Sequence, residues 1–423
     1  MPSLVEANNI FERIVQESPF NIESMAREFG AFVRSRSIEN SEELLRAVLL
    51  YCGLDYSLRE VATNFTQAGH RLSDEAVRGR LLKCERWLEA MLQIMLPKPE
   101  TEIGARRLIL VDGTCIQAPG PVSADYRLHL AWDWVRQRVS FMLATDFRTG
   151  ESLDLYPWAS GDVVLADAGY TRTRHLINVK KKGVEYVVRY AGNGPKVLGK
   201  TGLPLKVADE LRKYRDHRQV SIPVRIGCDG ESHEVFLHAF RLSGKSAERA
   251  LRKVKRRAQK QSRVRPKADT LFLAQWLIIL TSFKPEEVPA ETIGKLYRAR
   301  WEIELVIKRL KSILNLNALR ARRGSRLAQV YLLGKSLYAL MVERRALKIS
   351  PYREIDWRLW RIVADQIRNW ITLSDVVSTQ VTPRVLRVLK ERSRKRQRLR
   401  SKLLRVISPI TCANQLNTSG LSA

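Results

Sequence analysis

Four residues between positions 297 and 311 carry side chains that can act on phosphate groups. In the segment YRARWEIELVIKRLK they are a phenol, a guanidinium, a carboxylate and an ammonium: Tyr297, Arg300, Glu304 and Lys311. On an α-helix their spacing places all four within an arc of about 60° on one face. The apolar residues of the segment project to the opposite face. A metal-binding carboxylate among phosphate-binding groups indicates chemistry on a phosphodiester.

The spacing Y-x2-R-x3-E-x6-K resembles the YREK signature of bacterial insertion-sequence transposases of the DDE class. The resemblance implies that Glu304 is the third member of an Asp-Asp-Glu metal triad. It also predicts two upstream aspartates, each at the end of a buried strand. The apolar run RLILVDGT ends near Asp112, and the run GDVVLADAGY ends near Asp167. We therefore predict Asp112, Asp167 and Glu304 as the catalytic and metal-binding triad.

Each acid also has a structural alternative. An aspartate that closes a strand before glycine, as Asp112 does, is often a turn residue, and the same holds for Asp167. Asp146 in ATDFRTG is a rival for the second position. Glu302 competes with Glu304 but projects away from the cationic face. The order of strand aspartate, strand aspartate and helix glutamate is the order that the family requires, and it favours the predicted triad.

A divalent metal cofactor follows from the chemistry. Phosphodiester cleavage and transfer need an activated oxygen nucleophile and neutralisation of charge on the scissile phosphate, and two divalent ions about 3.5–4 Å apart supply both. Carboxylates are suitable ligands for Mg²⁺, which takes one or two protein acids per ion. We expect two Mg²⁺ ions, with Mn²⁺ as a substitute.

The cations of the helix are predicted DNA ligands. By the resemblance, Arg300 and Lys311 contact phosphates of the bound strand, the first as a bidentate fork and the second as a point charge. Tyr297 would hydrogen-bond a phosphate near the cleaved bond, and Lys308 lies on the same face. The alternative is a solvated basic helix face.

Trp276 is a further candidate for DNA contact. Relatives that form hairpin intermediates carry a Trp at this spacing before the Glu, and a flipped base stacks on it. A core Trp in a buried strand is the equally weighted alternative. Trp301 is expected to pack beside the site.

Composition indicates a globular protein with a polyanionic partner. The chain has 423 residues, of which 45% are hydrophobic, and 74 Lys and Arg against 44 acids give a net charge of +30. Such an excess destabilises a compact fold by self-repulsion unless a polyanion binds. The five cysteines show no zinc spacing and indicate a reducing compartment. The N-terminus does not resemble a signal peptide, and the most apolar run (271–283) is too short for a membrane span. We expect a cytoplasmic, nucleoid-associated bacterial protein without membrane contact.

The pattern of elements predicts a mixed α/β chain in three parts. Residues 1–100 read as a helical DNA-binding domain, with a weak helix-turn-helix pattern for which an ordinary helical bundle is the alternative. Residues 101–324 read as a ribonuclease H-like catalytic core, interrupted by an inserted β-rich subdomain at about 178–284. Residues 325–423 read as a helical, basic C-terminal domain for dimerisation or DNA contacts.

The resemblance implies a cut-and-paste DNA transposase of an insertion sequence. It implies nicking at the inverted-repeat ends of double-stranded DNA, hairpin formation, strand transfer into target DNA, and a homodimer in a synaptic complex. The alternatives are a ribonuclease H-like nuclease without strand transfer and a transposase-derived DNA-binding regulator.

Two basic runs lead to a prediction about salt. The runs 252–267 and 383–405 are rich in Lys and Arg, and we expect the first to be a flexible cationic loop. Because phosphate contacts release counterions, DNA affinity should fall linearly with the logarithm of salt concentration, with a slope of about −0.9 per phosphate neutralised. Fluorescence anisotropy from low to physiological salt measures that slope. An affinity that does not change with salt would contradict the electrostatic interpretation.

Overall fold

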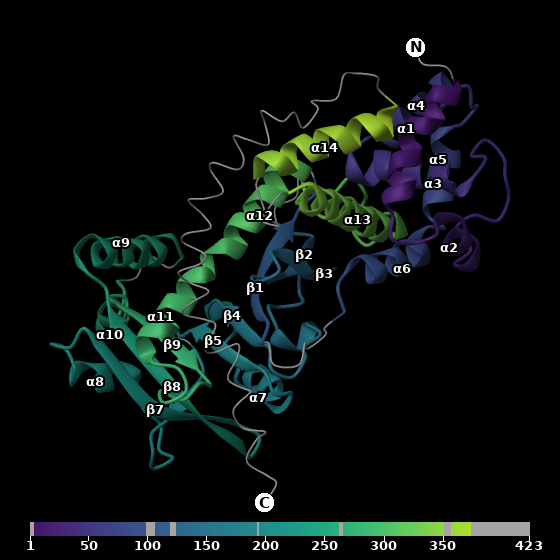
Figure 1. Cartoon of the computed structure of the whole chain (residues 1–423). Helices are drawn as coiled ribbons and strands as arrows, with labels where there is room; N and C mark the ends of the chain where they lie inside the picture. Colours follow the sequence, from purple (N-terminus) through teal and green to yellow (C-terminus); the bar gives the residue numbers. More distant parts are fainter. Residues whose placement is uncertain are drawn as a thin grey trace, which may run out of the picture.

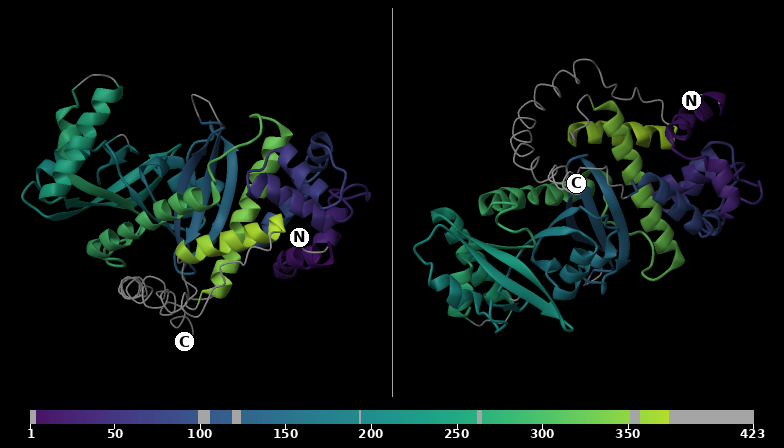
Figure 2. Two further views of the ribbon diagram at one scale, coloured as in Figure 1. Left: turned by 90° about the horizontal axis from the view of Figure 1, so that it is seen from above. Right: turned by 60° about the horizontal axis from the view of Figure 1, so that its bottom comes forward.

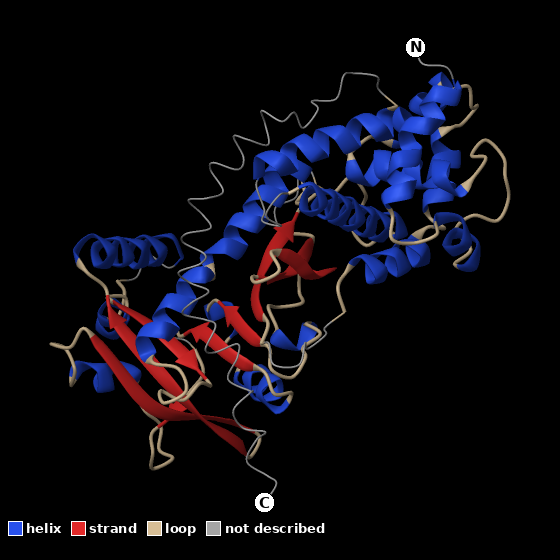
Figure 3. Cartoon of the chain, in the orientation of Figure 1, coloured by secondary structure: helices blue, strands red, loops and turns tan. Residues whose placement is uncertain are grey.

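The computed structural model describes residues 4–98, 106–118, 124–192, 194–261, 265–350 and 357–373. One sheet runs through the centre of the molecule, and helices gather at one of its ends (Figures 1 and 3). The other end of the sheet carries a smaller β-rich lobe with a separate helix beside it. Figure 2 shows the same division from two further directions.

The sheet is mixed and has nine strands. They are β1 (Leu108–Ile116), β2 (Tyr126–Asp133), β3 (Arg138–Asp146), β4 (Val163–Ala166), β5 (Glu185–Arg189), β6 (Val197–Leu198), β7 (Gln219–Cys228), β8 (Glu231–Arg241) and β9 (Trp276–Thr281). Their order is β3-β2-β1-β4-β5-β9-β8-β7-β6. Strands β1, β2 and β3 pair antiparallel, and β4 and β5 join them in parallel. These five strands have the order expected of a ribonuclease H-like core.

Helices surround the sheet. They are α1 (Leu4–Glu17), α2 (Ile22–Glu28), α3 (Ser41–Val48), α4 (Leu58–Gln67), α5 (Asp74–Leu81), α6 (Glu85–Met95), α7 (Thr173–Lys181), α8 (Val207–Arg212), α9 (Gly244–Gln261), α10 (Ala268–Leu273), α11 (Ala290–Ala299), α12 (Trp301–Leu314), α13 (Arg326–Ile349) and α14 (Trp357–Thr372). A capping box is present at the start of α4, between Ser57 and Glu60. The basic run expected as a flexible loop is helical through Gln261, in α9.

The inserted strands continue the central sheet. The expected insertion began at about residue 178, but that position lies within α7. Strand β5 pairs in parallel with β4 and completes the core, so the inserted strands begin after Arg189. Strand β9 then pairs antiparallel with β5, with Val187 opposite Thr281. The insertion is therefore an extension of the same sheet.

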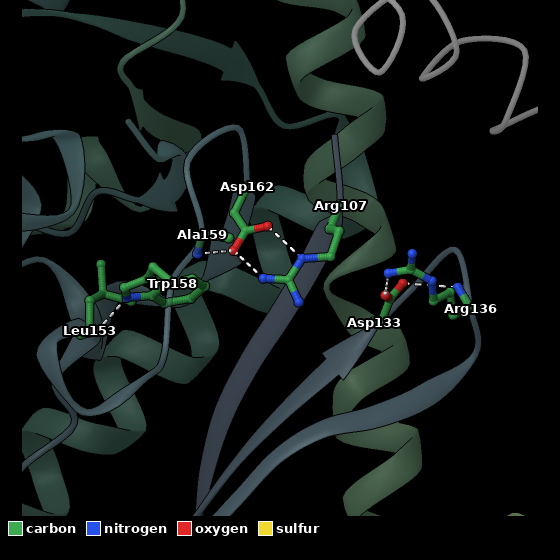
Figure 4. Close-up of polar contacts among 7 residues, drawn as sticks. All are labelled: Arg107, Asp133, Arg136, Leu153, Trp158, Ala159 and Asp162. Atoms are coloured by element: carbon green, nitrogen blue, oxygen red, sulfur yellow. Dashed lines mark hydrogen bonds and ion pairs between the residues drawn. The ribbon is translucent and has the colours of Figure 1, made fainter. Parts of the chain in front are cut away.

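A buried ion pair fixes the starts of β1 and β4 (Figure 4). Arg107, just before β1, donates from Nε to Asp162 Oδ1 at 2.7 Å and from Nη2 to Asp162 Oδ2 at 2.5 Å. Asp162, just before β4, also accepts the backbone N–H of Ala159 at 2.9 Å. Because both strands are clamped at their starts, the residues at their far ends keep a fixed relative position.

The helices before and after the catalytic core share one hydrophobic core. It includes buried residues of α1 to α6, the inner face of the sheet, and α11 to α14. Helix α13 reaches the sheet directly, where Glu343 accepts the backbone N–H of Val139 in β3 at 2.7 Å. Lys335 of α13 and Asn315, just after α12, both bond Asp55 of the N-terminal helices. The basic run 383–405 lies outside the described residues.

None of the helices in the described ranges combines the length and apolar character that a membrane crossing demands.

The clamp in Figure 4 yields a stability prediction. Asp162→Ala leaves the buried Arg107 guanidinium without its partner, so the free energy of unfolding should fall by about 3–5 kcal/mol. Glu231→Gln removes one partner of the exposed pair with Lys181, and it should cost about 1 kcal/mol or less. Urea denaturation followed by circular dichroism measures both. Equal losses in the two variants would contradict a structural role for the clamp.

Candidate active site

Asp112 lies on β1, and Asp167 directly follows β4, the parallel strand beside it. Leu110 of β1 pairs with Leu165 of β4, and the two aspartates follow these residues by two positions each. Burial, and then the negative charge of Asp167, raise the pKa of Asp112 to about 6. The sequence predicted that β1 ends at Asp112. Instead β1 continues to Ile116, because its pairing with β2 extends that far.

Each aspartate is held by a neighbouring backbone group. Asp112 Oδ1 accepts the N–H of Gly113 at 2.8 Å, and Asp167 Oδ1 accepts the N–H of Gly169 at 2.7 Å. Among the described residues, the second oxygen of each accepts no hydrogen bond. Both side chains are half-buried. The pair therefore presents two oriented carboxylates, each with an oxygen available to a ligand.

Glu304 lies on α12, which packs against β1. Its carboxylate forms an ion pair with Arg300, and the Arg300 side chain is only 14% exposed. The positive charge of Arg300 also acts on Asp112, whose pKa it lowers against the larger effect of burial. Arg300 is therefore near both the aspartate pair and Glu304. In the ranges that the structure covers, no three His, Cys, Asp or Glu side chains are grouped so as to hold a metal ion.

The other predicted residues of the helix differ in exposure. Tyr297 is 8% exposed, and its ring centre lies 5.8 Å from the Arg300 guanidinium carbon. Burial raises the pKa of Tyr297, while Arg300 and Arg189 lower it. Lys308 is exposed and Lys311 is half-buried. Helical spacing keeps both on the Glu304 face, although a break at Arg300 separates α11 from α12.

Trp276 is buried at the start of β9. Its side chain is 3% exposed, with the Phe272 ring centre at 6.5 Å and the Arg241 guanidinium carbon at 5.7 Å. These contacts fit the core-packing alternative. Trp301, which was expected to pack beside the site, is instead 58% exposed on α12.

Sequence reasoning did not single out Glu151. It lies in the loop after β3, and burial, followed by the charge of Asp167, raises its pKa. No motif or spacing marks this residue, because it comes to the site through the loop that connects β3 to β4. Asp146, the rival for the second acid, pairs with Arg323 at 3.3 Å instead. In the sheet, Asp146 of β3 pairs with Tyr126 of β2, which in turn pairs with Ile116 of β1. Ile116 lies four residues beyond Asp112 on that strand.

The donor set at these strand ends suits a divalent cation. The available atoms are carboxylate oxygens, which hard cations such as Mg²⁺ prefer. The raised pKa of Asp112 reflects a low-dielectric place with like charge nearby, which a cation would relieve. Asp112 and Asp167 are positioned to act together. Glu304 is held in its ion pair with Arg300.

The Asp112 carboxyl gives a pH prediction for the metal-free protein. Its pKa rises from an ordinary 3.8 to about 6 on folding, which corresponds to about 3 kcal/mol. The contribution of this carboxyl to the free energy of unfolding is fully present below its unfolded pKa and is lost as pH rises through its folded pKa of about 6. Asp112→Asn should therefore melt at a higher temperature than the unmodified chain at pH 8 in chelator, with little difference near pH 4. Calorimetry between pH 4 and pH 8 measures the melting temperatures of both chains. A lower melting temperature at pH 8 would contradict repulsion at the site.

Comparison with known proteins matches this site to one family. The family model for a transposase DDE domain matches residues 103–340, which include all three predicted acids. Over 336 residues the chain is 33% identical to InsL, named as a transposase for insertion sequence element IS186A in Escherichia coli (strain K12), covering 77% of this chain and 90% of that protein.

Two further relatives carry similar names. The transposase for insertion sequence element IS421 of Escherichia coli is 33% identical over 337 residues, with the same two coverages of 77% and 90%. The transposase for insertion sequence element IS231F of Bacillus thuringiensis subsp. israelensis is 20% identical over 272 residues, covering 57% of this chain and 55% of that protein. With its ribonuclease H-like strand order and its paired aspartates, the chain belongs to the DDE transposases, enzymes that act on DNA.

Proposed function

We propose that this transposase moves an insertion sequence by cut-and-paste transposition, with Asp112, Asp167 and Glu304 as its catalytic acids. One observation carries the proposal. Parallel pairing of β1 with β4 sets Asp112 beside Asp167, and the raised pKa of Asp112 shows how closely like charge and burial act on it. The names of the relatives support an insertion-sequence substrate, namely double-stranded DNA with inverted-repeat ends.

DDE domains use divalent metal, and we assign Asp112, Asp167 and Glu304 as the residues that would hold it, with two Mg²⁺ ions or Mn²⁺ in their place. When bound, the metal activates the attacking oxygen and neutralises charge on the scissile phosphate. The carboxylates orient the reacting phosphate between the sheet and α12. Burial of Asp112 restricts water at this position.

Arg300 controls access of Glu304 to the site. In the protein without DNA its guanidinium is paired with Glu304. A DNA phosphate offers Arg300 a second partner that can accept two parallel hydrogen bonds from its guanidinium. We propose that phosphate binding draws Arg300 away from Glu304 and frees that carboxylate to face the aspartates. Tyr297, against Arg300, and Lys308 and Lys311, further along α12, would hold the same strand.

The transferred strand undergoes two displacements at phosphorus. In the first, a water oxygen forms a bond to phosphorus at the element end, the bond to the 3′ oxygen breaks, and a 3′-hydroxyl is released. In the second, that hydroxyl attacks a phosphodiester of target DNA, and the target's own 3′ oxygen leaves. We further propose that two chains act as a homodimer on paired ends.

A hairpin intermediate is a separate part of the proposal. It would require a base to leave the duplex and stack on an aromatic face. Trp276, the residue expected to provide that face, is buried against Phe272 and Arg241. Stacking at this position would need α10 to move. Trp276→Ala should lower hairpin yield more than first-strand nicking if the platform exists, and both steps equally if the side chain is only core.

The central test uses cloned element ends, target DNA and Mg²⁺, with products resolved on a denaturing gel. Asp112→Ala, Asp167→Ala and Glu304→Ala should each abolish cleavage, a loss of at least about a thousandfold, while end binding in a mobility-shift assay stays largely intact. Asp146→Ala is the matched control, an acid at a strand end that pairs with Arg323 instead, and it should cut normally.

Two outcomes would change the assignment. Normal cutting by any one of the three variants removes that residue from the triad. Hydrolysis of ends without strand-transfer product would indicate the alternative function, a ribonuclease H-like nuclease.

A further inference from the structure

One row across the sheet brings Asp112, Asp167 and Arg189 side by side. The pairing of β1 with β4 aligns Asp112 with Asp167, and the pairing of β4 with β5 aligns Asp167 with Arg189. Neighbouring strands are about 4.8 Å apart, so Arg189 begins one strand beyond Asp167. Buried apolar residues bound the row, with Leu130 of β2 opposite Asp112 and Ile279 of β9 opposite Arg189. Arg189 is therefore the cation of this row.

The row points to the face of the sheet that α11 and α12 cover. Two positions before the charged residues, each strand buries a side chain in the core that includes both helices: Leu110, Leu165 and Val187. One position before them, each strand contributes to the core of the opposite face: Val111, Ala166 and Val188. Asp167 keeps an extended backbone after β4 ends, so the alternation of side chains continues through it. Asp112, Asp167 and Arg189 therefore project toward the helix that carries Glu304.

Arg189 is exposed, although its backbone is fixed. Strand β5 lies between β4 and β9, and the N–H of Tyr190 donates to the carbonyl of Ile278 at 2.9 Å. Val188 before Arg189 and Tyr190 after it are buried. Among the described residues, the Arg189 guanidinium makes no hydrogen bond and no ion pair. It is a cation at a fixed place beside two acids, and its donors are available to an anionic ligand.

Tyr297 lies near both Arg189 and Arg300. It belongs to the last turn of α11, which packs against β5. Its ring centre is 5.8 Å from the Arg300 guanidinium carbon. Burial raises the pKa of Tyr297, and the positive charges of Arg300 and then Arg189 oppose that rise. One guanidinium from the sheet and one from the helix thus flank the same phenol.

Arg300 also has an unsatisfied donor at this place. Its Nε is buried and makes no hydrogen bond among the described residues. A buried donor without an acceptor is unfavourable until a ligand oxygen satisfies it. Two guanidinium groups around one phenol suit phosphate oxygens, because each guanidinium can donate two parallel hydrogen bonds to them. The ligand that this arrangement fits is a phosphodiester of DNA.

The position in the row indicates which phosphodiester it is. Under the proposed function the scissile phosphate lies over Asp112 and Asp167. Arg189 begins one strand further along the row, so its side chain reaches the next phosphate of the same DNA strand. Its charge there opposes the repulsion between that phosphate and the two carboxylates.

We propose that Arg189 binds the DNA phosphate next to the scissile one and, together with Arg300, holds the cleaved strand across Tyr297. The inference deepens the proposed function and rests on it. Arg189 contacts the strand from the sheet, on the side of Asp167 remote from Asp112. Arg300 contacts it from the start of α12. The strand is thereby fixed on both sides of the phenol while its scissile phosphate stays over the aspartates.

The test is the single-turnover cleavage rate of pre-bound element ends with Mg²⁺, measured with the full chain. Arg189→Gln should slow cleavage about 10–100-fold, the loss expected for charge-assisted hydrogen bonds. Arg189→Lys keeps the charge but loses the planar fork, so its rate should be intermediate. Arg225→Gln is the matched control. It removes the same charge from an exposed position on β7, which β9 and β8 separate from β5, and it should cut normally.

A second measurement identifies the phosphate. Uncharged methylphosphonates replace the phosphates on either side of the scissile one, one at a time. At one of these two positions the native chain and Arg225→Gln should lose about as much rate as Arg189→Gln does. Arg189→Gln itself should lose little more there, because both changes remove one contact.

Melting temperatures and mobility shifts separate this role from a structural one. Arg189→Gln should melt at the temperature of the native chain, because the side chain has no protein partner to lose. Its binding to element ends should weaken no more than that of Arg225→Gln. A lower melting temperature that accounts for the slower cleavage would contradict the inference.

The remaining outcomes separate the inference from the function on which it rests. Normal cleavage by Arg189→Gln, beside inactive Asp112→Ala and Asp167→Ala, would overturn the role of Arg189 and leave the aspartate site standing. Normal cleavage by all three variants would overturn the proposed function as well. Full additivity of Arg189→Gln with the methylphosphonates at both neighbouring positions would also contradict the inference.

Discussion

Burial of Asp112 beside the like charge of Asp167 is the constraint on which the candidate site depends. Two carboxylates on adjacent parallel strands cannot move apart unless the strands do, and the Arg107–Asp162 pair holds those strands at their opposite ends. The unfavourable charge is therefore stored in the fold rather than relaxed by it. A proton, a cation or a cationic side chain relieves it, and Arg300 partly fills that place.

The charge balance on α12 follows from the same constraint. An acid added directly to the aspartate pair would increase the repulsion. Pairing with Arg300 removes that cost, because the charge of Glu304 is neutralised by its own neighbour on the helix. The helix face thus carries its own counter-ion, which a DNA phosphate can compete for. Under the proposed function, affinity for the substrate and completion of the metal site would become one event, as in other enzymes that assemble a site on binding.

The sequence was informative where a single element decides the outcome. Helical periodicity predicted one helix through Tyr297, Arg300 and Glu304, which the structure breaks at Arg300, and apolar runs placed Asp112 and Asp167 on or directly after neighbouring strands. The pairing of Arg300 with Glu304 also follows from their separation of four positions on a helix.

The remaining features depend on contacts between distant segments. Glu151 reaches the site because two glycines, one on each side of it in space, leave room for its carboxylate. Trp276 is buried at the start of β9, where it pairs with Arg241 of β8, a contact between distant segments. The extension of β1 beyond Asp112 depends on its partner β2.

The pairing of β9 with β5 has a consequence for the evolution of the chain. Without β9, the backbone of β5 would present unpaired N–H and C=O groups beside the buried side chains of Val187 and Val188. Such an exposed strand edge can pair with strands of other chains and promotes aggregation. Excision of the whole insertion would therefore not recover a minimal soluble enzyme. Within the insertion, the outer rim around β6, where the sheet already ends, is where we expect changes in length to be tolerated.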